Sequence, residues 1–285
     1  MSVSIIGCGW LGQALAQALL AENIEVLASY QSQSTLEKLN SLNIPSTQLM
    51  LPITADINEL ENNLDIAGVE QALFQQDVLV IAIPPQLKKG RLDYPLKIQQ
   101  LVKLAELGQT KQIVLLNTTA IYNGLVGEID ESKALNLSAE KVETLLAAEQ
   151  AVQEFSKQVH ILRLAGLVGP NRHPGKFLQA DRLFKNASAQ VNLVHQTDVV
   201  NIIKMLIEGR VKQSSKIYNV VSGTKTSRKD YYQQTAKAMG LAEPRFEQEQ
   251  VSNAGKQVVG DKLRKELNYN YLYDDLLQWA TTLQA

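Results

Sequence analysis

Three glycines near the start of the chain have the spacing of a turn that holds a phosphate. The turn, Gly7-Cys8-Gly9-Trp10-Leu11-Gly12, follows the short apolar run Val3 to Ile6 and opens an apolar-periodic segment, Leu11 to Leu20. Between a strand and a helix, the first glycine makes the tight turn, the second lets the backbone approach a pyrophosphate, and the third lets the helix pack closely. The helix N-terminus adds free N–H groups and partial positive charge. A turn without a ligand is the alternative, which this context disfavours. We therefore expect dinucleotide contacts at Gly7, Gly9, Trp10, Leu11 and Gly12.

The end of the second predicted strand decides the type of dinucleotide. A preference for NAD usually appears there as an Asp or Glu that accepts hydrogen bonds from the ribose hydroxyls. The segment Ala28-Ser29-Tyr30-Gln31-Ser32 contains no acidic residue. Because a carboxylate would repel a 2′-phosphate, its absence mildly favours NADP over NAD, although no Arg is present to attract that phosphate. We expect Ser29, Tyr30 and Gln31 to contact the cofactor.

The segments around these residues alternate between strand-like and helix-like patterns. Val78 to Ile83 is a continuous apolar run ended by Pro84-Pro85, typical of a strand buried on both faces of a parallel sheet. The patterns predict further strands at 24–28, 48–51, 113–116, 159–164 and 216–221, and helices at 36–42, 94–107 and 139–155. This alternation predicts an α/β fold, a Rossmann-type doubly wound parallel sheet with helices on both faces.

The pattern changes after Ala165. Residues 166–175 contain three Gly and two Pro, which indicates a loop at the carboxyl end of a strand, where ligands bind in such sheets. Helices are expected at 176–185 and 197–208, and the tail, 227–285, is mostly helical by pattern. The sequence therefore predicts a dinucleotide-binding domain over 1–165, with a returning segment near 192–222. A smaller C-terminal substrate-binding subdomain takes 166–191 and 223–285.

Composition narrows the class of protein. The 285 residues are 45% hydrophobic and 20% charged, as expected for a globular core. The net charge of −1 and the scattered charges predict neither nucleic-acid nor membrane-surface binding. No apolar run reaches the roughly 18 residues of a membrane span, and no basic segment precedes the first apolar run, so we expect no signal peptide. Cys8 is the single cysteine and the three histidines lack metal-ligand spacing, which predicts a cytoplasmic protein without a metal centre.

Five segments share their order and spacing with one known superfamily. They are the glycine turn, Ile113 to Tyr122, Ala147 to Val152, Leu162 to Pro170, and a stretch that starts at Val194 and ends at Val221. Together they resemble the short-chain dehydrogenase/reductase superfamily, in its extended or atypical branch of NAD-dependent epimerase/dehydratase proteins. The resemblance implies a Rossmann fold, an NAD(P) cofactor and a small polar substrate.

The resemblance also assigns candidate residues. Thr118 matches the catalytic Ser/Thr, whose hydroxyl would bind a substrate oxygen, although a β-branched residue that caps a strand is an equal alternative. Ile83, Pro84 and Asn117 would lie beside the cofactor. Asp198 is expected to cap a helix. Arg172, with His173 and Lys176, forms a basic cluster that could meet a phosphate, although exposed charges are the default. The substrate contacts expected are Asn171, Arg172 and His195.

The sequence lacks one catalytic motif of the superfamily, so a prediction of cofactor binding does not by itself predict catalysis. Members that oxidise or epimerise use Tyr-x-x-x-Lys, and none of the nine tyrosines has Lys four residues later. Alignment on Ala147-Ala148-Glu149 places Lys141 and Leu145 at the two positions. Tyr122 is then the candidate for a displaced proton donor. Its free phenol would need a nearby cation at neutral pH, so a packing role is favoured.

The combined prediction is an NAD(P)-binding protein of the epimerase/dehydratase type, acting on a sugar nucleotide or a similar polar carbonyl compound. Because the Tyr–Lys pair is missing, a catalytically silent dinucleotide sensor or interaction protein is the first alternative. A 6-phosphogluconate dehydrogenase-like reductase is the second, but its largely helical second domain fits the later predicted strands poorly. The substrate and the oligomeric state, including a homodimer, stay open.

Overall fold

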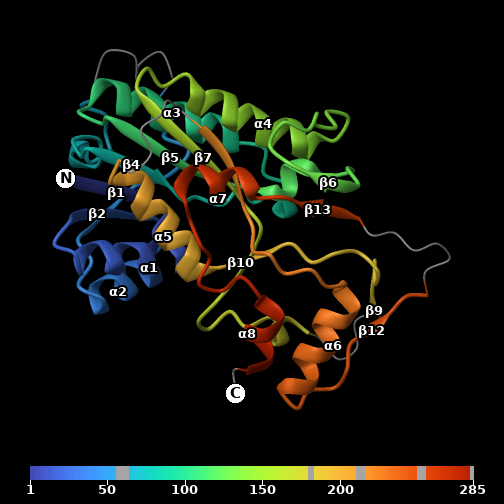
Figure 1. The fold of residues 1–285 in the computed structure, drawn as a ribbon. Helices are drawn as coiled ribbons and strands as arrows, with labels where there is room; N and C mark the ends of the chain where they lie inside the picture. Colours follow the sequence, from blue (N-terminus) through green and yellow to red (C-terminus); the bar gives the residue numbers. More distant parts are fainter. Residues whose placement is uncertain (56–63, 179–182, 210–215, 249–254, 283–285) are drawn as a thin grey trace. The chain divides into compact units, whose positions relative to one another are not determined.

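A seven-stranded sheet is the centre of the structure, a computed structural model that describes all residues except 56–63, 179–182, 210–215, 249–254 and 283–285. The strand order is β11-β7-β5-β4-β1-β2-β3 (Figure 1). The first strand, β1 (Ser2–Ile6), pairs in parallel with β2 (Glu25–Tyr30) on one side and with β4 (Val78–Ile81) on the other. The chain thus runs outward from β1 in both directions, which confirms the predicted doubly wound fold.

The remaining strands extend the two halves of the sheet. β3 (Ser46–Gln48) pairs in parallel with β2, and β5 (Gln112–Thr118) pairs in parallel with β4. β7 (Gln158–Leu164) and β11 (Lys216–Val220) follow β5 at the far edge. All four residues of β4 are buried, as its unbroken apolar sequence predicts for a strand covered on both faces.

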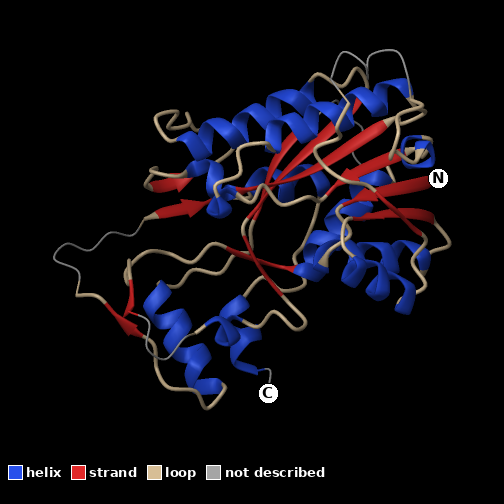
Figure 2. Cartoon of the chain, turned by 180° about the vertical axis from the view of Figure 1, so that it is seen from behind, coloured by secondary structure: helices blue, strands red, loops and turns tan. Residues whose placement is uncertain are grey.

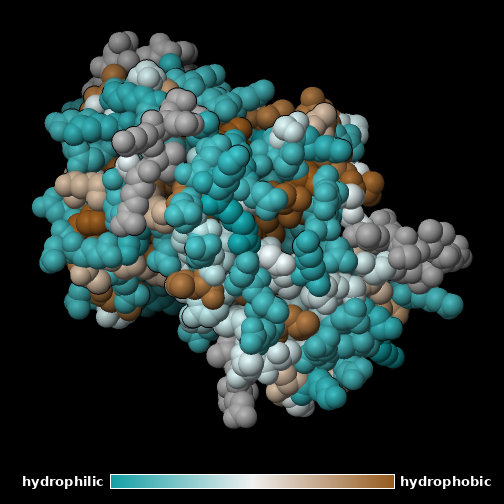
Figure 3. Space-filling model, in the orientation of Figure 1, coloured by the Kyte–Doolittle hydropathy of each residue, from teal (hydrophilic) through white to brown (hydrophobic). Residues whose placement is uncertain are grey.

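Helices cover both faces of the sheet. α3 (Tyr94–Leu107) and α4 (Glu140–Gln153) lie side by side on one face, and α1 (Trp10–Leu20) and α2 (Gln33–Ser41) lie on the other (Figures 1 and 2). α1 buries Leu11, Leu15 and Leu19, which recur every four residues and so form one apolar stripe. The face of the molecule in Figure 3 is mostly hydrophilic, with hydrophobic residues in separate patches.

The chain divides into two compact units. Unit 1 consists of Met1–Ile121, Leu137–Arg163 and Ile202–Ile217. Unit 2 consists of Tyr122–Asn136, Leu164–Asn201 and Tyr218–Ala285. The predicted dinucleotide-binding domain, 1–165, includes Tyr122–Asn136, which the structure groups with unit 2. The helix α5 (Gln196–Ile207) begins in unit 2 and ends in unit 1.

Unit 2 is built from short elements. Parallel pairs join β6 (Gly127–Ile129) to β13 (Lys256–Val258), β8 (Gly166–Val168) to β10 (Leu193–His195), and β9 (Leu183–Phe184) to β12 (Arg245–Phe246). Its helices are α6 (Arg228–Ala238), α7 (Asp261–Leu267) and α8 (Leu276–Thr282). A core cluster joins β8, α6 and α8: Val168, Val191, Tyr231, Leu276 and Ala280.

Two local predictions in this unit are wrong. The helix expected at 176–185 is a 3₁₀ turn at Pro174–Phe177 and the strand β9, with 179–182 outside the described residues. The loop expected at 166–175 begins with the strand β8. The partners of β8 and β9 lie far away in sequence, so local pattern does not reveal the pairing. The tail, expected to be mostly helical, also contains β12 and β13.

Candidate functional site

Neighbouring atoms restrict two of the three glycines of the turn, and the third lies against open space. Gly7 has a φ of +88°, and a Cβ atom built on it would lie 2.8 Å from Ile83 Cγ2 and 2.9 Å from Ile83 N. A Cβ atom on Gly12 would lie 3.2 Å from the Gly7 carbonyl oxygen, because the first turn of α1 packs on the glycine turn. A Cβ atom on Gly9 would meet no atom within 4 Å. The space in front of Gly9 is therefore open to a ligand.

This open space faces a helix start without a side-chain cap. Gly9 is the N-cap residue of α1 and supplies no side chain, and Trp10, half-exposed, is the first helical residue. Leu11 is buried and contributes to the core. Helix N-termini with free N–H groups bind phosphate through hydrogen bonds and the helix dipole. The residues present thus fit the pyrophosphate of a dinucleotide.

Ser29 supports the turn from the neighbouring strand. The Gly7 N–H donates to Ser29 Oγ at 3.0 Å, and the Cys8 N–H donates to the Ser29 carbonyl at 3.2 Å. The Ser29 side chain, 3% exposed, is thus committed to the turn. Burial raises the pKa of the Cys8 thiol to about 12, so this side chain stays a neutral, packed group at physiological pH. Ser29 therefore shapes the site through the backbone of the turn.

The end of β2 leads directly into α2. Tyr30 is the last residue of the strand, Gln31 is exposed, and Ser32 caps α2 by accepting a hydrogen bond from the Thr35 N–H at 3.3 Å. The Ser32 hydroxyl also lies 3.1 Å from Ser34 Oγ and 2.9 Å from Thr35 Oγ1. Hydroxyls and amides, without a carboxylate, thus occupy the position that selects between the two cofactors.

A buried ion pair orients Asn117 at the end of β5. Glu149, on α4, is 1% exposed and accepts hydrogen bonds from Arg163 Nε at 2.9 Å and Nη2 at 2.6 Å. The Asn117 amide donates to Glu149 Oε1 at 2.7 Å and, at 3.4 Å, to the Leu145 carbonyl. The other amide atom, Asn117 Oδ1, is buried without a hydrogen-bond partner in the described structure. A buried acceptor of this kind, at the carboxyl end of a central strand, fits a ligand that brings a donor.

Sequence reasoning missed this ion pair, although the sequence carries a signal for it. Glu149 stands in an alanine-rich helix and Arg163 stands inside an apolar strand. Charged residues at such core positions are rarely buried unless they are paired. Leu145, at the superfamily's Lys position, is fully buried, and Lys141, at its Tyr position, is exposed.

Thr118 and Tyr122 have different surroundings. Thr118, half-buried at the last position of β5, accepts a hydrogen bond from the Ala120 N–H at 3.1 Å. Within unit 2, Tyr122 is completely buried and its hydroxyl donates to Asn219 Oδ1 at 2.8 Å. Asn219 is held in turn by the Val259 carbonyl at 3.0 Å. The geometry leaves Thr118 accessible and favours the packing role for Tyr122.

The three residues of the predicted basic cluster, Arg172, His173 and Lys176, do not form one phosphate-binding group within unit 2. Asn171 has a φ of +59°, and the Arg172 N–H donates to the Gly169 carbonyl at 2.9 Å. Pro170 and Asn171 are thus the central residues of a tight turn. His173 is buried, with Nε2 3.0 Å from the Ala280 carbonyl and Nδ1 accepting from the Gly175 N–H. Arg172 and Lys176 are exposed, but the histidine between them serves packing.

His195 lies in an aromatic cluster of unit 2. Its ring centroid is 3.8 Å from that of Tyr273 and 4.9 Å from that of Trp279. Nδ1 accepts a hydrogen bond from the Thr197 N–H at 3.2 Å. Burial lowers the pKa of His195 to about 4, so the imidazole is neutral at pH 7.

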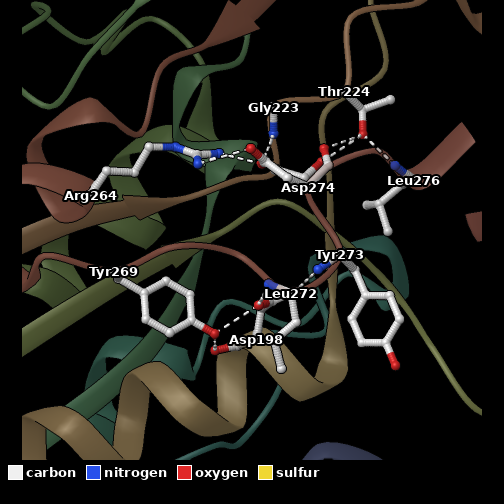
Figure 4. Close-up of polar contacts among 10 residues, drawn as sticks. Asp198, Gly223, Thr224, Arg264, Tyr269, Leu272, Tyr273, Asp274 and Leu276 are labelled. Carbon is white, nitrogen blue, oxygen red and sulfur yellow. Dashed lines mark hydrogen bonds and ion pairs between the residues drawn. The ribbon is translucent and has the colours of Figure 1, made fainter. Parts of the chain in front are cut away.

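Asp198 does not cap α5 as expected. Its carboxylate accepts hydrogen bonds from the Tyr269 hydroxyl and the Leu272 N–H, each at 2.7 Å, and from the Tyr273 N–H at 3.1 Å (Figure 4). The side chain points toward the C-terminal segment, because three donors there outcompete the first turn of its own helix. Asp198 therefore holds the segment that places the Tyr273 ring on His195.

The N-terminal half matches a family of dehydrogenases. Residues 1–153 match the model of the UDP-glucose/GDP-mannose dehydrogenase family, NAD binding domain. The chain belongs to this family. Protein YeeZ of Escherichia coli K12 is 32% identical to this chain over 280 residues, which cover 96% of this chain and 97% of YeeZ. The dinucleotide turn thus belongs to an NAD-binding domain, as its spacing predicts.

Solved structures extend the likeness of the fold to the whole chain. UDP-glucuronic acid 4-epimerase from Bacillus cereus, in complex with NAD, has a TM-score of 0.73 at 18% identity, covering 99% of this chain and 94% of that one. MoeE5 in complex with UDP-glucuronic acid and NAD has a TM-score of 0.75 at 16% identity, covering 99% and 97%. This chain therefore has the fold of NAD-dependent epimerases, as the sequence resemblance predicts. These comparisons name NAD and do not support the preference for NADP.

The described residues show neither a metal site nor a membrane-spanning helix. Among the described residues, no group of three His, Cys, Asp or Glu side chains is placed to hold a metal ion. Each helix in the described part of the chain is too short or too polar to cross a membrane.

Proposed function

We propose that the protein is an NAD-dependent oxidoreductase or epimerase that acts on a sugar nucleotide. The open space in front of Gly9, at the uncapped start of α1, is the observation that carries this proposal. Two of the fold neighbours named above were solved with NAD, and one of them also with UDP-glucuronic acid. The helix N-terminus would bind the pyrophosphate, and Asn117 would lie beside the nicotinamide half. NAD, when bound, supplies the nicotinamide C4 position that accepts or returns a hydride.

Thr118 is the residue we assign to the substrate. Its hydroxyl, half-buried at the carboxyl end of β5, would hydrogen-bond the oxygen of the carbon that loses or gains the hydride. In the oxidation direction, that carbon loses a hydride and its hydroxyl loses a proton. Because the Tyr122 hydroxyl is committed to Asn219, we assign the proton to a water molecule beside Thr118.

The test combines binding with turnover. Calorimetry on the purified chain should detect NAD or NADH, and NADPH is the second cofactor to try because the end of β2 has no carboxylate to repel a 2′-phosphate. UDP-glucose and UDP-glucuronic acid are the first substrates to test, by absorbance of NADH and by product analysis. Absence of affinity for all these dinucleotides at millimolar concentration would refute the proposal.

We also propose a cytoplasmic location, because Cys8 is the single cysteine.

A catalytically silent sensor is the second candidate. The exposed Lys141 and buried Leu145 replace the Tyr–Lys pair, and the Tyr122 hydroxyl is occupied, so none of these three residues is placed for proton transfer. In this case NAD binds with no turnover of either nucleotide sugar. Turnover that falls sharply in Thr118→Val would reject it.

A further inference from the structure

The loop after β4 carries a group of cations that the proposed function does not use. Lys88, Lys89 and Arg91 stand within four consecutive residues, and all three are exposed. The nearest acidic side chain in sequence, Asp93, pairs with Lys97 at 2.9 Å. No ion pair of these three cations is found in the described part of the chain. Among the described residues, the loop therefore presents three positive charges without an ion-pair partner.

The start of this loop lies against the glycine turn. A Cβ atom on Gly7 would contact both Ile83 Cγ2 and Ile83 N, so the first residues after β4 touch the turn itself. β4 and β1 are neighbours, and the chain leaves them in opposite directions across the sheet. The carboxyl ends of such a strand pair form the switch point where ligands bind in doubly wound sheets.

The backbone of the loop is held in an unusual conformation. Gln86, with a φ of +54°, and Gly90, with a φ of +70°, flank the 3₁₀ turn Leu87–Lys89. Hydrogen bonds from the Lys89 N–H to the Gln86 carbonyl at 2.8 Å and from the Gly90 N–H to the Leu87 carbonyl at 3.0 Å close the turn. A left-handed conformation is unfavourable for a residue with a side chain, and such residues gather at ligand-binding sites.

We propose that Lys88, Lys89 and Arg91 bind the phosphate groups of a nucleotide ligand at the carboxyl end of β4. The proposal rests on the proposed function and deepens it, because it assigns the recognition of phosphate to unit 1. Lys88 and Lys89 stand in the hydrogen-bonded turn and Arg91 follows Gly90, all within eight residues after Ile83, which lies against the glycine turn. Both the dinucleotide cofactor and a nucleotide sugar carry diphosphates, and the same cations suit either one.

The test compares four forms of the full chain. The first is the native protein, the second is Lys88→Ala/Lys89→Ala/Arg91→Ala, and the third is the control Lys38→Ala/Lys229→Ala/Lys237→Ala. The control removes the same charge from exposed positions on α2 and α6. Calorimetry measures NAD binding to each form, and then UDP-glucose binding to each NAD-loaded form. A form with Lys88→Arg, Lys89→Arg and Arg91→Lys keeps the charge and should keep the affinity.

In low salt, we expect the loop variant to bind at least one of these two ligands with an affinity about tenfold or more below that of the native protein. At several times that salt concentration the loss should shrink, because ions screen exposed charges over about 10 Å at 0.1 M. A loss for NAD alone assigns the cations to the cofactor, and a loss for UDP-glucose alone assigns them to the substrate. Unchanged affinity for both ligands, or an equal loss in the control, overturns the proposal. Failure of the native chain to bind NAD, NADH and NADPH alike refutes the proposed function itself.

Discussion

The carboxylate of Asp198 accepts a hydrogen bond from the hydroxyl of Tyr269 at 2.7 Å, and both side chains are buried. The same carboxylate binds the backbone N–H groups of Leu272 and Tyr273. A few residues on, Asp274 accepts from Arg264 and from the Gly223 N–H, and its backbone carbonyl accepts from the Thr224 hydroxyl at 3.3 Å (Figure 4). Two carboxylates thus hold the segment from Tyr269 to Asp274 within unit 2.

Asp198→Ala should lower the free energy of unfolding by about 3 kcal/mol, because it leaves the buried Tyr269 hydroxyl and two partly buried N–H groups without an acceptor. Urea denaturation measures the loss. Glu243→Gln, which changes an exposed carboxylate in the same unit, is the control and should change the free energy by less than about 0.5 kcal/mol. Equal stability of Asp198→Ala and the control would show that the contacts contribute nothing.

Substitutions at two glycines of the turn should have different effects, one on NAD binding and the other on stability. Gly9→Ala should fold with native stability, because its Cβ atom meets nothing within 4 Å and its φ of −83° suits any residue. The same Cβ should weaken NAD binding about tenfold or more by occupying the ligand's approach. Gly7→Ala should instead lose about 1–2 kcal/mol or more of stability, since φ is positive and Ile83 blocks the Cβ. Native NAD affinity in Gly9→Ala, measured by calorimetry, would contradict the placement of the pyrophosphate.

Arg163→Met should destabilise the protein by about 3–5 kcal/mol, because it leaves the buried Glu149 carboxylate without its cation. Adding Glu149→Leu should recover part of that loss, since the double variant has no buried charge. Denaturant unfolding of the two variants provides the comparison. If the double variant is less stable than Arg163→Met, the hydrogen bond between Asn117 and Glu149 contributes more to stability than the unpaired Glu149 carboxylate costs.

Two buried histidines predict a loss of stability in mild acid. Burial lowers the pKa of His160 and of His195 from 6.5 to about 4 in the folded protein. Between these values the unfolded chain binds protons that the folded chain does not, so acid favours unfolding. Each histidine should lower the free energy of unfolding by about 1.4 kcal/mol per pH unit between roughly pH 6 and 4. Denaturation curves at pH 7.5 and 5 test this prediction. His160→Asn should reduce the difference in the free energy of unfolding between the two pH values, whatever the stability of the variant at pH 7.5.

Thr118→Val tests the assigned substrate contact. Valine keeps the β-branched shape at the end of β5 and removes the hydroxyl together with its hydrogen bond from the Ala120 N–H. The free energy of unfolding should therefore fall by about 1 kcal/mol, and NAD affinity should stay within about twofold of the native value. Turnover of an accepted nucleotide sugar should fall about tenfold to a hundredfold, mainly in kcat, if the hydroxyl binds the reacting oxygen in the transition state. Unchanged kcat and KM would remove Thr118 from the reaction.

The sheet and the cofactor turn could be predicted because their signals are local. Unbroken apolar runs such as Val78 to Ile83 have few alternatives to a buried strand. The Gly7–Gly12 spacing reflects steric needs within one turn, since a Cβ on Gly7 would meet Ile83 and a Cβ on Gly12 would crowd the Gly7 carbonyl. A doubly wound order then follows from alternation and crossover handedness.

The roles of polar side chains depended on tertiary structure. Asp198 follows a strand and opens a helix, as a capping residue does, yet its partners lie in a segment about seventy residues later. Tyr122 and His173 have types suited to catalysis, and packing buries both. Asn117 is one polar residue among several at a strand end until Glu149 and Arg163 orient its amide. The sequence by itself therefore determined the sheet and the dinucleotide turn, whose causes are local sterics and burial. Only the tertiary structure decided which polar groups remain available for chemistry, because that depends on partners brought together from distant parts of the chain.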